Sequence, residues 1–279
     1  MRPIFHSISC LISVALLAAP AQAQQTPAIT PGSVSNAASA NTPVALGSLI
    51  SIYGTSLSPV TDIDTVTPLP PTMDGVSVTV NGVVAPLWFV SAGQINAQIP
   101  WEALAAAPPT TANATAQVIV STKTGGASAP EPITIAPVAP GIFTFSYGAG
   151  QAIAYNYADG TFAAAATIPG YPTVPVRPVK INDPNPLVIY ATGLGAVSPS
   201  VASGYAPATG IVANTLVTPQ VLVGGVPAQV NFSGLSPYVG VYQLNVTVNT
   251  GTPTGSAIPL QIQMNGVISR NDVTIAVSQ

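Results

Sequence analysis

The chain has 279 residues, of which 48% are hydrophobic and only 5% are charged, and its formal net charge is −3. An ordinary soluble domain has about 25% charged residues. The low charge excludes the basic surface that nucleic acid and anionic lipid require, and the high hydrophobicity excludes disorder and favours a packed fold.

The first 23 residues predict a secretory signal peptide. Arg2 supplies a positive start, an apolar run covers residues 8–19, and Ala21-Gln22-Ala23 places small residues where the peptidase cleaves. The apolar run is too short to serve as a membrane anchor. We therefore expect a mature chain that begins at Gln24 and does not insert into membranes. It would be secreted to the extracellular space or the cell surface, with the periplasm as the alternative.

The single histidine and the single cysteine, His6 and Cys10, both lie in this leader. The mature chain therefore cannot assemble a Ser-His-Asp triad, a Cys-His pair, a His-ligated zinc site or a thiolate cluster by itself. We predict that it is not an enzyme and has no catalytic, cofactor-binding or metal-binding residues. Without disulfides, its stability must come from core packing and sheet hydrogen bonds.

After a loose tail at residues 24–31, the pattern predicts a succession of short strands. Residues 76–80 alternate apolar and polar side chains, and Asn81-Gly82 then predicts a tight hairpin turn. Only residues 101–107 predict a helix, of one or two turns. Strands this short, separated by Gly and Pro, predict an all-β sandwich. The other predicted strands cover residues 49–53, 86–90, 95–99, 117–121, 133–136, 187–191, 220–223, 228–232, 241–248, 258–264 and 273–277.

Three blocks of sequence recur in the same order, which indicates an internal repeat. Residues 49–57 match 186–194, residues 81–85 match 224–228, and residues 94–99 match 243–248. The repeat predicts two related β-sandwich domains, 24–138 and 139–279, joined at the extended segment 137–140. We expect the second domain to open with a hairpin over residues 143–156, in which Asn156 stands where Asn36 stands in the first. Residues 163–186 predict a long loop.

Several segments resemble a bacterial extracellular module known mainly from acidobacteria, the Solibacter-type C-terminal domain. The resemblance covers nearly the whole mature chain, and each half is also similar, more weakly, to the IPT/TIG immunoglobulin-like fold. It implies an exported all-β protein of two tandem immunoglobulin-like β-sandwich domains, and it implies no established activity and no catalytic residues. The segments are Asn36-Ala37-Ala38-Ser39, Gly47-Ser48-Leu49, Gly93-Gln94-Ile95-Asn96 with Pro100-Trp101-Glu102, Ala139-Pro140-Gly141-Ile142-Phe143, Tyr190-Ala191-Thr192-Gly193-Leu194-Gly195 and Gly225-Val226-Pro227-Ala228.

Two groups of polar side chains are candidates for chemistry or ion binding. A pair of carboxylates could supply acid–base groups for glycoside hydrolysis, but the sequence context of each carboxylate is that of a turn. Other acidic and amide side chains offer oxygen ligands that suit calcium, without the spacing of an EF-hand loop. We expect turns at both, with weak calcium binding as the alternative at the second. The carboxylates are Glu102, Glu131, Asp159 and Asp183, and the oxygen clusters are Asp62-Ile63-Asp64 and Asn182-Asp183-Pro184-Asn185.

Trp88, Trp101 and the nine tyrosines are candidates for a platform that stacks against sugar rings. Against this, Trp88-Phe89-Val90 predicts a core-facing strand, and Trp101 begins the single helical turn. Because buried aromatic side chains are the ordinary case in sandwiches, we expect Trp88 and Trp101 to pack in the core.

The repeated strands also present amides on one face. Alternation places Gln94, Asn96 and Gln98 opposite Ile95, Ala97 and Ile99, and the second copy does the same with Gln243, Asn245 and Thr247. The plain interpretation is a solvated outer face. The alternative is a contact surface for the other domain, a neighbouring molecule or a sugar, because amides both donate and accept hydrogen bonds.

We therefore predict an exported, non-catalytic β-sandwich protein that serves adhesion, scaffolding or assembly at the cell surface or in the extracellular matrix. Its partner would be a protein or a polysaccharide, and not a nucleic acid. The alternative function is that of a carbohydrate-binding module, with a glycosidase as a weaker alternative. A row of exposed aromatic residues would favour carbohydrate, and a long unpaired edge strand would favour protein assembly.

Overall fold

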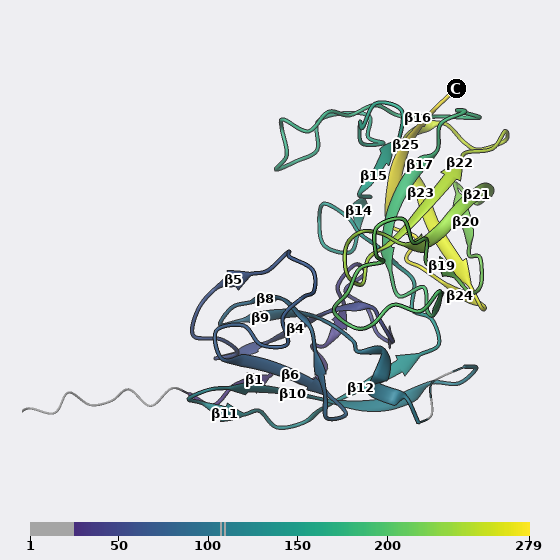
Figure 1. The fold of residues 1–279 in the computed structure, drawn as a ribbon. Coiled ribbons are helices and arrows are strands. Elements are labelled where there is room, and N and C mark those ends of the chain that lie inside the picture. The colour runs from purple at the N-terminus through teal and green to yellow at the C-terminus, as the bar shows by residue number, and fades with distance from the viewer. Residues whose placement is uncertain (1–24, 107, 109) are drawn as a thin grey trace, which may run out of the picture.

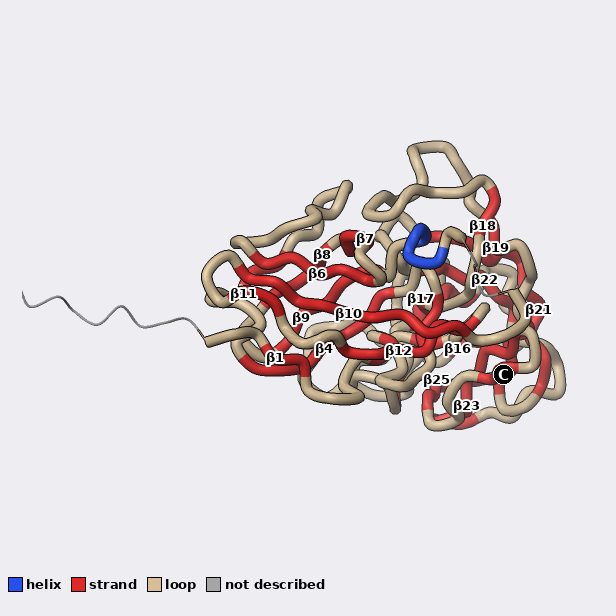
Figure 2. The backbone as a smooth tube through the Cα atoms, turned by 90° about the horizontal axis from the view of Figure 1, so that it is seen from below, coloured by secondary structure: helices blue, strands red, loops and turns tan. Residues whose placement is uncertain are grey.

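The computed structural model describes residues 25–106, 108 and 110–279. In this described part, strands are joined by turns and loops, and one 3-10 helix, η1 (Trp101–Leu104), is the only helix (Figure 2). None of the described helical segments is long and apolar enough to cross a membrane. The predicted signal peptide of residues 1–23 and the expected new N-terminus at Gln24 lie outside the described residues.

The first half forms two six-stranded sheets whose apolar faces meet in one core, where Ile50, Val78, Leu87, Ile95 and Val118 are fully buried. One sheet has the order β1-β4-β9-β8-β5, with β2 paired to β4, and the other has the order β3-β12-β10-β6-β7, with β11 paired to β10. The strands are β1 (Ala28–Ile29), β2 (Ser35–Asn36), β3 (Val44–Ala45), β4 (Leu49–Thr55), β5 (Asp62–Ile63), β6 (Val76–Val80), β7 (Val83–Ala85), β8 (Leu87–Val90), β9 (Gln94–Gln98), β10 (Ala114–Thr122), β11 (Gly126–Ala127) and β12 (Glu131–Ala136).

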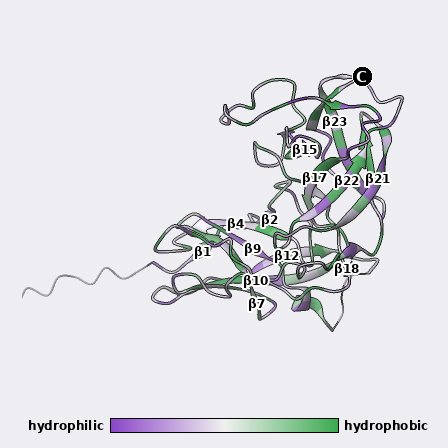
Figure 3. Ribbon diagram, turned by 45° about the horizontal axis from the view of Figure 1, so that its top comes forward, coloured by the Kyte–Doolittle hydropathy of each residue, from purple (hydrophilic) through white to green (hydrophobic). Residues whose placement is uncertain are grey.

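The second half wraps thirteen strands around a core of its own, in the order β13-β17-β22-β21-β20-β23-β25-β14 with five short strands off this path. The strands are β13 (Gly141–Ile142), β14 (Gly150–Gln151), β15 (Ala154–Asn156), β16 (Val179–Lys180), β17 (Leu187–Thr192), β18 (Val197–Ser198), β19 (Asn214–Thr215), β20 (Gln220–Val223), β21 (Val226–Leu235), β22 (Tyr242–Thr247), β23 (Gly255–Met264), β24 (Val267–Ile268) and β25 (Val273–Ser278). Hydrophobic and hydrophilic residues alternate along β21 and β22, as one buried face requires (Figure 3).

The internal repeat is a repeat of strand pairing. Tyr53 on β4 lies opposite Gln94 on β9, and Tyr190 on β17 lies opposite Gln243 on β22, which are the positions that the sequence blocks equate. Asn36 pairs with Ile50, and Asn156 pairs with Leu187, so the expected equivalence of the two asparagines is confirmed. The chain is therefore all-β and consists of two tandem immunoglobulin-like β-sandwiches.

Turns and bulges repeat with the strands. The β6–β7 turn at Asn81-Gly82 and the β20–β21 turn at Gly224-Gly225 both have positive φ at their two central residues, the conformation that favours these residue types in a two-residue hairpin. The pairing register shifts between Leu87 and Phe89 on β8, and it shifts again between Val230 and Phe232 on β21. Each run for which the sequence predicts a strand overlaps an observed strand, and the hairpin expected in residues 143–156 is present as an antiparallel pairing of Thr144 with Ala152.

Three expectations about irregular segments are wrong. The tail at 24–31 contains β1, which pairs with Gly54 and Thr55 because the edge of β4 offers unpaired backbone groups. The loop at 163–186 contains β16, which adds a parallel strand beside β25. The helical turn at 101–107 ends its regular hydrogen bonding at Leu104, and residue 107 lies outside the described residues.

The two halves are set at an angle to each other, which gives the molecule an L-shaped outline (Figure 1). Hydrogen bonds join them at the inner corner. The Thr192 hydroxyl accepts from Leu49 N at 3.0 Å and donates to Gly240 O at 2.7 Å, and all three groups are buried. Trp101 of the first half packs against the core of the second half. That residues 24–138 and 139–279 fold independently stays a prediction.

Candidate functional site

A cleft of about 490 Å³ lies in the corner between the two halves. The chain has two Trp, nine Tyr and six Phe residues, and nine of these aromatic side chains line this one cleft. No charged side chain is among the described residues that line it. The aromatic lining consists of Tyr53, Trp88, Phe89, Phe143, Phe145, Tyr147, Tyr171, Tyr190 and Tyr238.

One cross-strand row of side chains forms the first-half wall of the cleft. The five members belong to adjacent strands in the order β2-β4-β9-β8-β5, and each lies opposite the next in the sheet register. Because side chains of directly opposed residues point to the same face of a sheet, the register brings all five to the cleft. The row runs Ser35, Ser51, Asn96, Phe89 and Ile63.

Trp88 and Phe89 line this wall, so the expectation that the Trp88-Phe89-Val90 run faces the core is wrong for its first two residues. The cause is the register shift on β8, where simple alternation breaks. Leu87 and Val90 remain fully buried in the core, while the two aromatic residues between them are part-buried and face the cleft. The Trp88 indole Nε1 donates to Val239 O at 3.3 Å in the other half.

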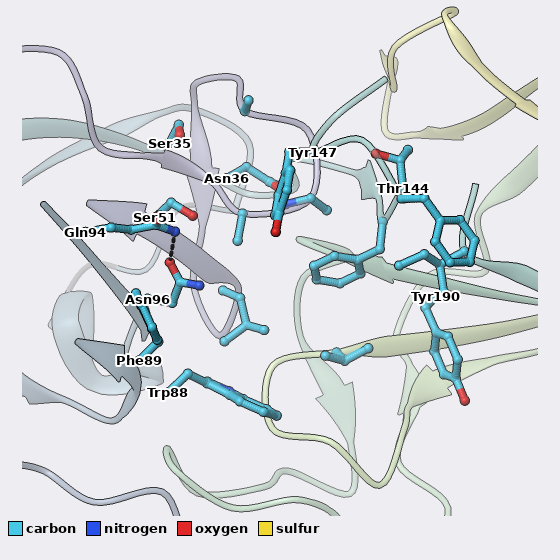
Figure 4. A pocket seen from close by; sticks show the side chains of 18 of the residues that line it. Ser35, Asn36, Ser51, Trp88, Phe89, Gln94, Asn96, Thr144, Tyr147 and Tyr190 are labelled. Atoms are coloured by element: carbon cyan, nitrogen blue, oxygen red, sulfur yellow. Dashed lines mark hydrogen bonds between the residues drawn. The ribbon is translucent and has the colours of Figure 1, made fainter. Parts of the chain in front are cut away.

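The second half supplies the opposite wall. Figure 4 shows Tyr147, Thr144 and Tyr190 across the cleft from Trp88 and Gln94. The Tyr147 side chain is the most exposed aromatic side chain of the described chain, at 83%, which leaves its ring open to a ligand.

The Tyr190 hydroxyl of this wall stays protonated at neutral pH. Tyr190 packs between Tyr155 and Tyr238, with ring centroids 6.0 Å and 6.4 Å away. Burial, with a hydrogen bond to Tyr155 as the second cause, raises the pKa of Tyr190 above its usual range. The hydroxyl therefore carries no negative charge near neutral pH.

Two residues of the predicted contact face, Gln94 and Asn96, lie in the cleft. Gln94 Nε2 donates to Asn96 Oδ1 at 2.8 Å, as the dashed line in Figure 4 marks. In the second half, Gln243 Nε2 donates to Asn245 Oδ1, also at 2.8 Å. The same pair of amides is therefore locked by the same bond in both halves.

The other predicted contact residues lie elsewhere. Gln98 is buried at the joint between the halves, where its side-chain oxygen accepts from Gly204 N at 2.7 Å. Thr247 accepts a hydrogen bond from Asn231 on β21. Gln243, Asn245 and Thr247 are not among the residues that line the cleft. The structure thus brings together two of the six predicted residues and places a third in the contact between halves.

Asn36, one of the residues quoted for the family resemblance, holds the segment that connects the two halves. Its side-chain oxygen accepts from the backbone of Ala38 and Ser39, and its nitrogen donates to Ala139 O at 2.8 Å. Gly193 packs on the same carbonyl with φ +80°, and a Cβ there would lie 2.1 Å from Ala139 O. The residue 137–140 segment is therefore held in place by both halves.

The predicted carboxylate candidates lie away from the cleft, each with its own hydrogen-bond partner. Glu102 accepts from Ser203, and Glu131 accepts from Gly32 N. Hydrogen bonds from Thr161 and then from Arg177 lower the pKa of Asp159 to about 2. Asp183 accepts from Asn185 N, as in an Asx turn.

Of the predicted calcium ligands Asp62 and Asp64, only Asp64 has the same turn geometry as Asp183. Asp62 accepts a hydrogen bond from Ile63 N, and Asp64 accepts one from Val66 N. Among the described residues, no three His, Cys, Asp or Glu side chains gather in one place. The turn interpretation accounts for the bond that Asp64 makes.

Several cleft residues were not singled out from the sequence, chiefly Ser35 and Ser51, and Tyr147 and Tyr238 were candidates only as members of the whole set of tyrosines. Ser51 and Tyr53 could have been placed with Gln94 and Asn96. Alternation puts Ser51 and Tyr53 on one face of β4, and β4 pairs with β9 as its repeat β17 pairs with β22. The residues of the opposite wall carry no such signal, since they belong to loops and strands of the other half.

No protein-family model and no curated protein sequence matches the chain. Similar solved structures include the extracellular region of plexin A4, at 11% identity over 98% of this chain and 17% of that one, with a TM-score of 0.29. Another is SGBP-B of the Bacteroides ovatus mixed-linkage glucan utilization locus in complex with a mixed-linkage heptasaccharide, at 11% identity over 84% of this chain and 45% of that one, with a TM-score of 0.34.

A third is the titin Z1Z2 pair in complex with telethonin, at 12% identity over 92% of this chain and 99% of that one, with a TM-score of 0.22. The chain spans less than a fifth of the plexin region and less than half of SGBP-B. All three similarities are weak, and the fold of this chain is defined by its own strand order and register.

Proposed function

We propose that the protein is an exported, non-catalytic binding protein whose cleft between the halves binds a neutral polysaccharide. The observation that carries the proposal is the lining of the cleft: nine aromatic side chains, the amides of Gln94 and Asn96, and no charged side chain among the described residues that line it. A volume of about 490 Å³ is within the usual range of ligand sites.

The lining suits the surface of a sugar. A sugar ring has apolar C–H faces, which pack on aromatic rings, and a rim of hydroxyl groups that both donate and accept hydrogen bonds. Amide and tyrosine side chains also do both. An anionic or cationic ligand would find no counter-charge in the cleft, and its burial there without a partner would be unfavourable.

The same lining argues against hydrolysis. Glycosidases use two carboxyl groups on either side of the scissile bond. None of the carboxylates of the described chain lines the cleft, so a bound glycan would be held without being cleaved. We propose that the protein also works without a metal or another cofactor.

In this proposal the protein serves adhesion or scaffolding at the cell surface or in the extracellular matrix by holding a glycan. Export rests on the leader-like first 23 residues. Membership of the Solibacter-type domain family rests on the segments quoted above and forms part of the same proposal.

The test is affinity electrophoresis of the protein in gels containing neutral polysaccharides (galactomannan, xyloglucan, soluble starch and laminarin) or anionic ones (polygalacturonate and alginate). We expect retardation by at least one neutral polymer and none by the anionic ones. Tyr147→Ala should abolish most of the retardation, since it removes an exposed ring from the cleft.

The matched control is Tyr205→Ala, which removes an exposed ring outside the cleft and should leave retardation unchanged. Absence of binding to every neutral polymer, or an equal effect of the two tyrosine variants, would contradict the proposal.

A further inference from the structure

We infer that Gln94 and Asn96 form an oriented donor–acceptor pair that recognises two adjacent hydroxyl groups on one sugar ring. This inference rests on the proposed function of the cleft and specifies the ligand more narrowly. It selects neutral glycans whose interior residues keep neighbouring hydroxyls free.

The bond between the two amides determines which of their atoms face a ligand. Gln94 Nε2 donates to Asn96 Oδ1, so the acceptor Gln94 Oε1 and the donor Asn96 Nδ2 remain. Neither remaining atom has a hydrogen-bond partner within the described part of the chain. Figure 4 shows the Asn96 nitrogen turned away from Gln94 and toward the interior of the cleft.

Amides that are free to rotate can present either atom to a ligand. Here a flip of either amide would break the 2.8 Å bond and would set like atoms against each other. Only a concerted flip of both amides preserves a bond between them, and it exchanges the two free atoms, so in either arrangement the pair presents one acceptor beside one donor. Two neighbouring hydroxyls on a ring complement such a pair, one by donating and the other by accepting.

The neighbours of the pair support a sugar ring as its ligand. Ser51, opposite Asn96 on β4, is 6% exposed, and its hydroxyl has no hydrogen-bond partner among the described residues. On the other side of Asn96 in the same row lies the ring of Phe89. Hydroxyl recognition at Ser51 and Asn96 is thus followed directly by an apolar surface.

The second half provides an internal control for this interpretation. Gln243 and Asn245 make the same bond at the same register, yet Val188 stands opposite Asn245 where Ser51 stands opposite Asn96. This second pair does not line the cleft. The hydrogen bond therefore belongs to the fold in both halves, whereas access to a ligand in the cleft is confined to the first.

The linkage of a glucan decides whether an interior residue has adjacent free hydroxyls. A 1,4-linked hexose keeps those at C2 and C3. A 1,3-linked hexose has C3 substituted, so its free ring hydroxyls at C2 and C4 are not neighbours. Hexasaccharides of equal length separate the two cases through their interior residues, because both kinds carry adjacent free hydroxyls on the terminal residue.

The experiment is titration calorimetry of the mature protein with cellohexaose, maltohexaose, mannohexaose and laminarihexaose. We expect at least one of the three 1,4-linked hexasaccharides to bind about fivefold or more tightly than laminarihexaose. Asn96→Ala and Gln94→Met should each weaken that binding by about five- to tenfold, the loss expected for one or two neutral hydrogen bonds.

Asn245→Ala and Gln243→Met are the controls, because they break the same bond in the second half. They should leave affinity within about twofold, and thermal unfolding should show that each variant is as folded as its counterpart. Agreement with both expectations supports the inference.

Two outcomes would overturn the inference alone: equal effects of Asn96→Ala and Asn245→Ala on affinity, or binding of polysaccharide by a protein that does not prefer any 1,4-linked hexasaccharide to laminarihexaose. Failure to bind any neutral polysaccharide in the electrophoresis panel would instead remove the proposed function itself.

Discussion

The two halves share one backbone plan but differ in the side chains of one cross-strand row. In the first half the row reads Ser35, Ser51, Asn96 and Phe89. In the second half the equivalent row reads Tyr155, Val188, Asn245 and Phe232. Small hydroxyl side chains at two positions are thus replaced by a large ring and a branched aliphatic side chain.

The difference shows that side-chain volume, and not strand register, decides whether this face is open. In the second half Tyr155 packs against Tyr190 and Phe162, and a loop of the same half continues the aromatic cluster through Phe145 and Tyr171. In the first half the two serines leave the space that the second half closes into a cleft. The two halves share the framework, and different residues at a few positions make one of them a candidate binding surface.

The largest expected effect is on the free energy of unfolding, and it should come from the hydrogen bonds that hold the first half against the second. Thr192→Val keeps the shape of the side chain but leaves the buried groups Leu49 N and Gly240 O without their bond. We expect the free energy of unfolding to fall by about 2–4 kcal/mol, measured by urea denaturation. Thr55→Val at the equivalent exposed position of β4 is the control and should change it by less than about 0.5 kcal/mol. Equal effects would mean that the joint does not contribute.

Exchange of the row residues should convert the first half toward the second. Ser35→Tyr installs the residue that stands at the equivalent position, Tyr155, and fills the cleft with a ring. We expect glycan affinity to fall by at least about tenfold, which corresponds to about 1.4 kcal/mol, with little change in thermal stability. Ser256→Tyr, at an exposed serine outside the cleft, should leave affinity unchanged, and retained affinity in Ser35→Tyr would show that the open row is not the binding surface.

A smaller effect concerns the stability of the two cores at high pH, because only the second core contains the buried Tyr242. The fully buried Tyr242 donates its hydroxyl proton to Gly195 O, and burial raises the pKa of Tyr242 above its usual range; its counterpart in the first half is Gly93. A raised folded-state pKa means that stability is complete below the unfolded value of about 10 and falls as the pH rises above it.

We therefore expect Tyr242→Phe to cost about 1 kcal/mol at pH 7 and to flatten the loss of stability above pH 10, measured by urea denaturation at pH 7 to 11. Tyr205→Phe, at an exposed tyrosine, should retain the alkaline slope of the unmodified protein. An unchanged slope in Tyr242→Phe would show that this hydroxyl does not control it.

The smallest expected effect is the pH dependence of binding itself. The titratable side chains among the described cleft residues are tyrosines, and burial raises the pKa of Tyr190 above its usual range. Affinity for a neutral glycan should therefore vary by less than about twofold between pH 5 and pH 9 in calorimetric titrations. A transition within this range would require a titrating group that the described cleft does not contain.

Much of the architecture follows from local pattern. Alternation along residues 76–80, the Asn81-Gly82 turn and the three repeated blocks determine the strands, the fold class and the equivalence of the halves, because each depends on neighbouring residues and on a period of two. The same alternation placed Gln94 and Asn96 on one face. It failed at Trp88 and Phe89, where a bulge inserts one residue and re-aims the side chains.

The cleft was decided only by the tertiary structure. Tyr147 and Tyr190 line the same cleft as Gln94 and Asn96 because Thr192, Asn36 and Gln98 bind the halves at one angle, through contacts between residues about 100 positions apart or more. Sequence alternation determines which face of a strand a side chain occupies, but it does not determine what docks on that face. The same amide pair is therefore part of a candidate binding site in the first half and lies outside the cleft in the second.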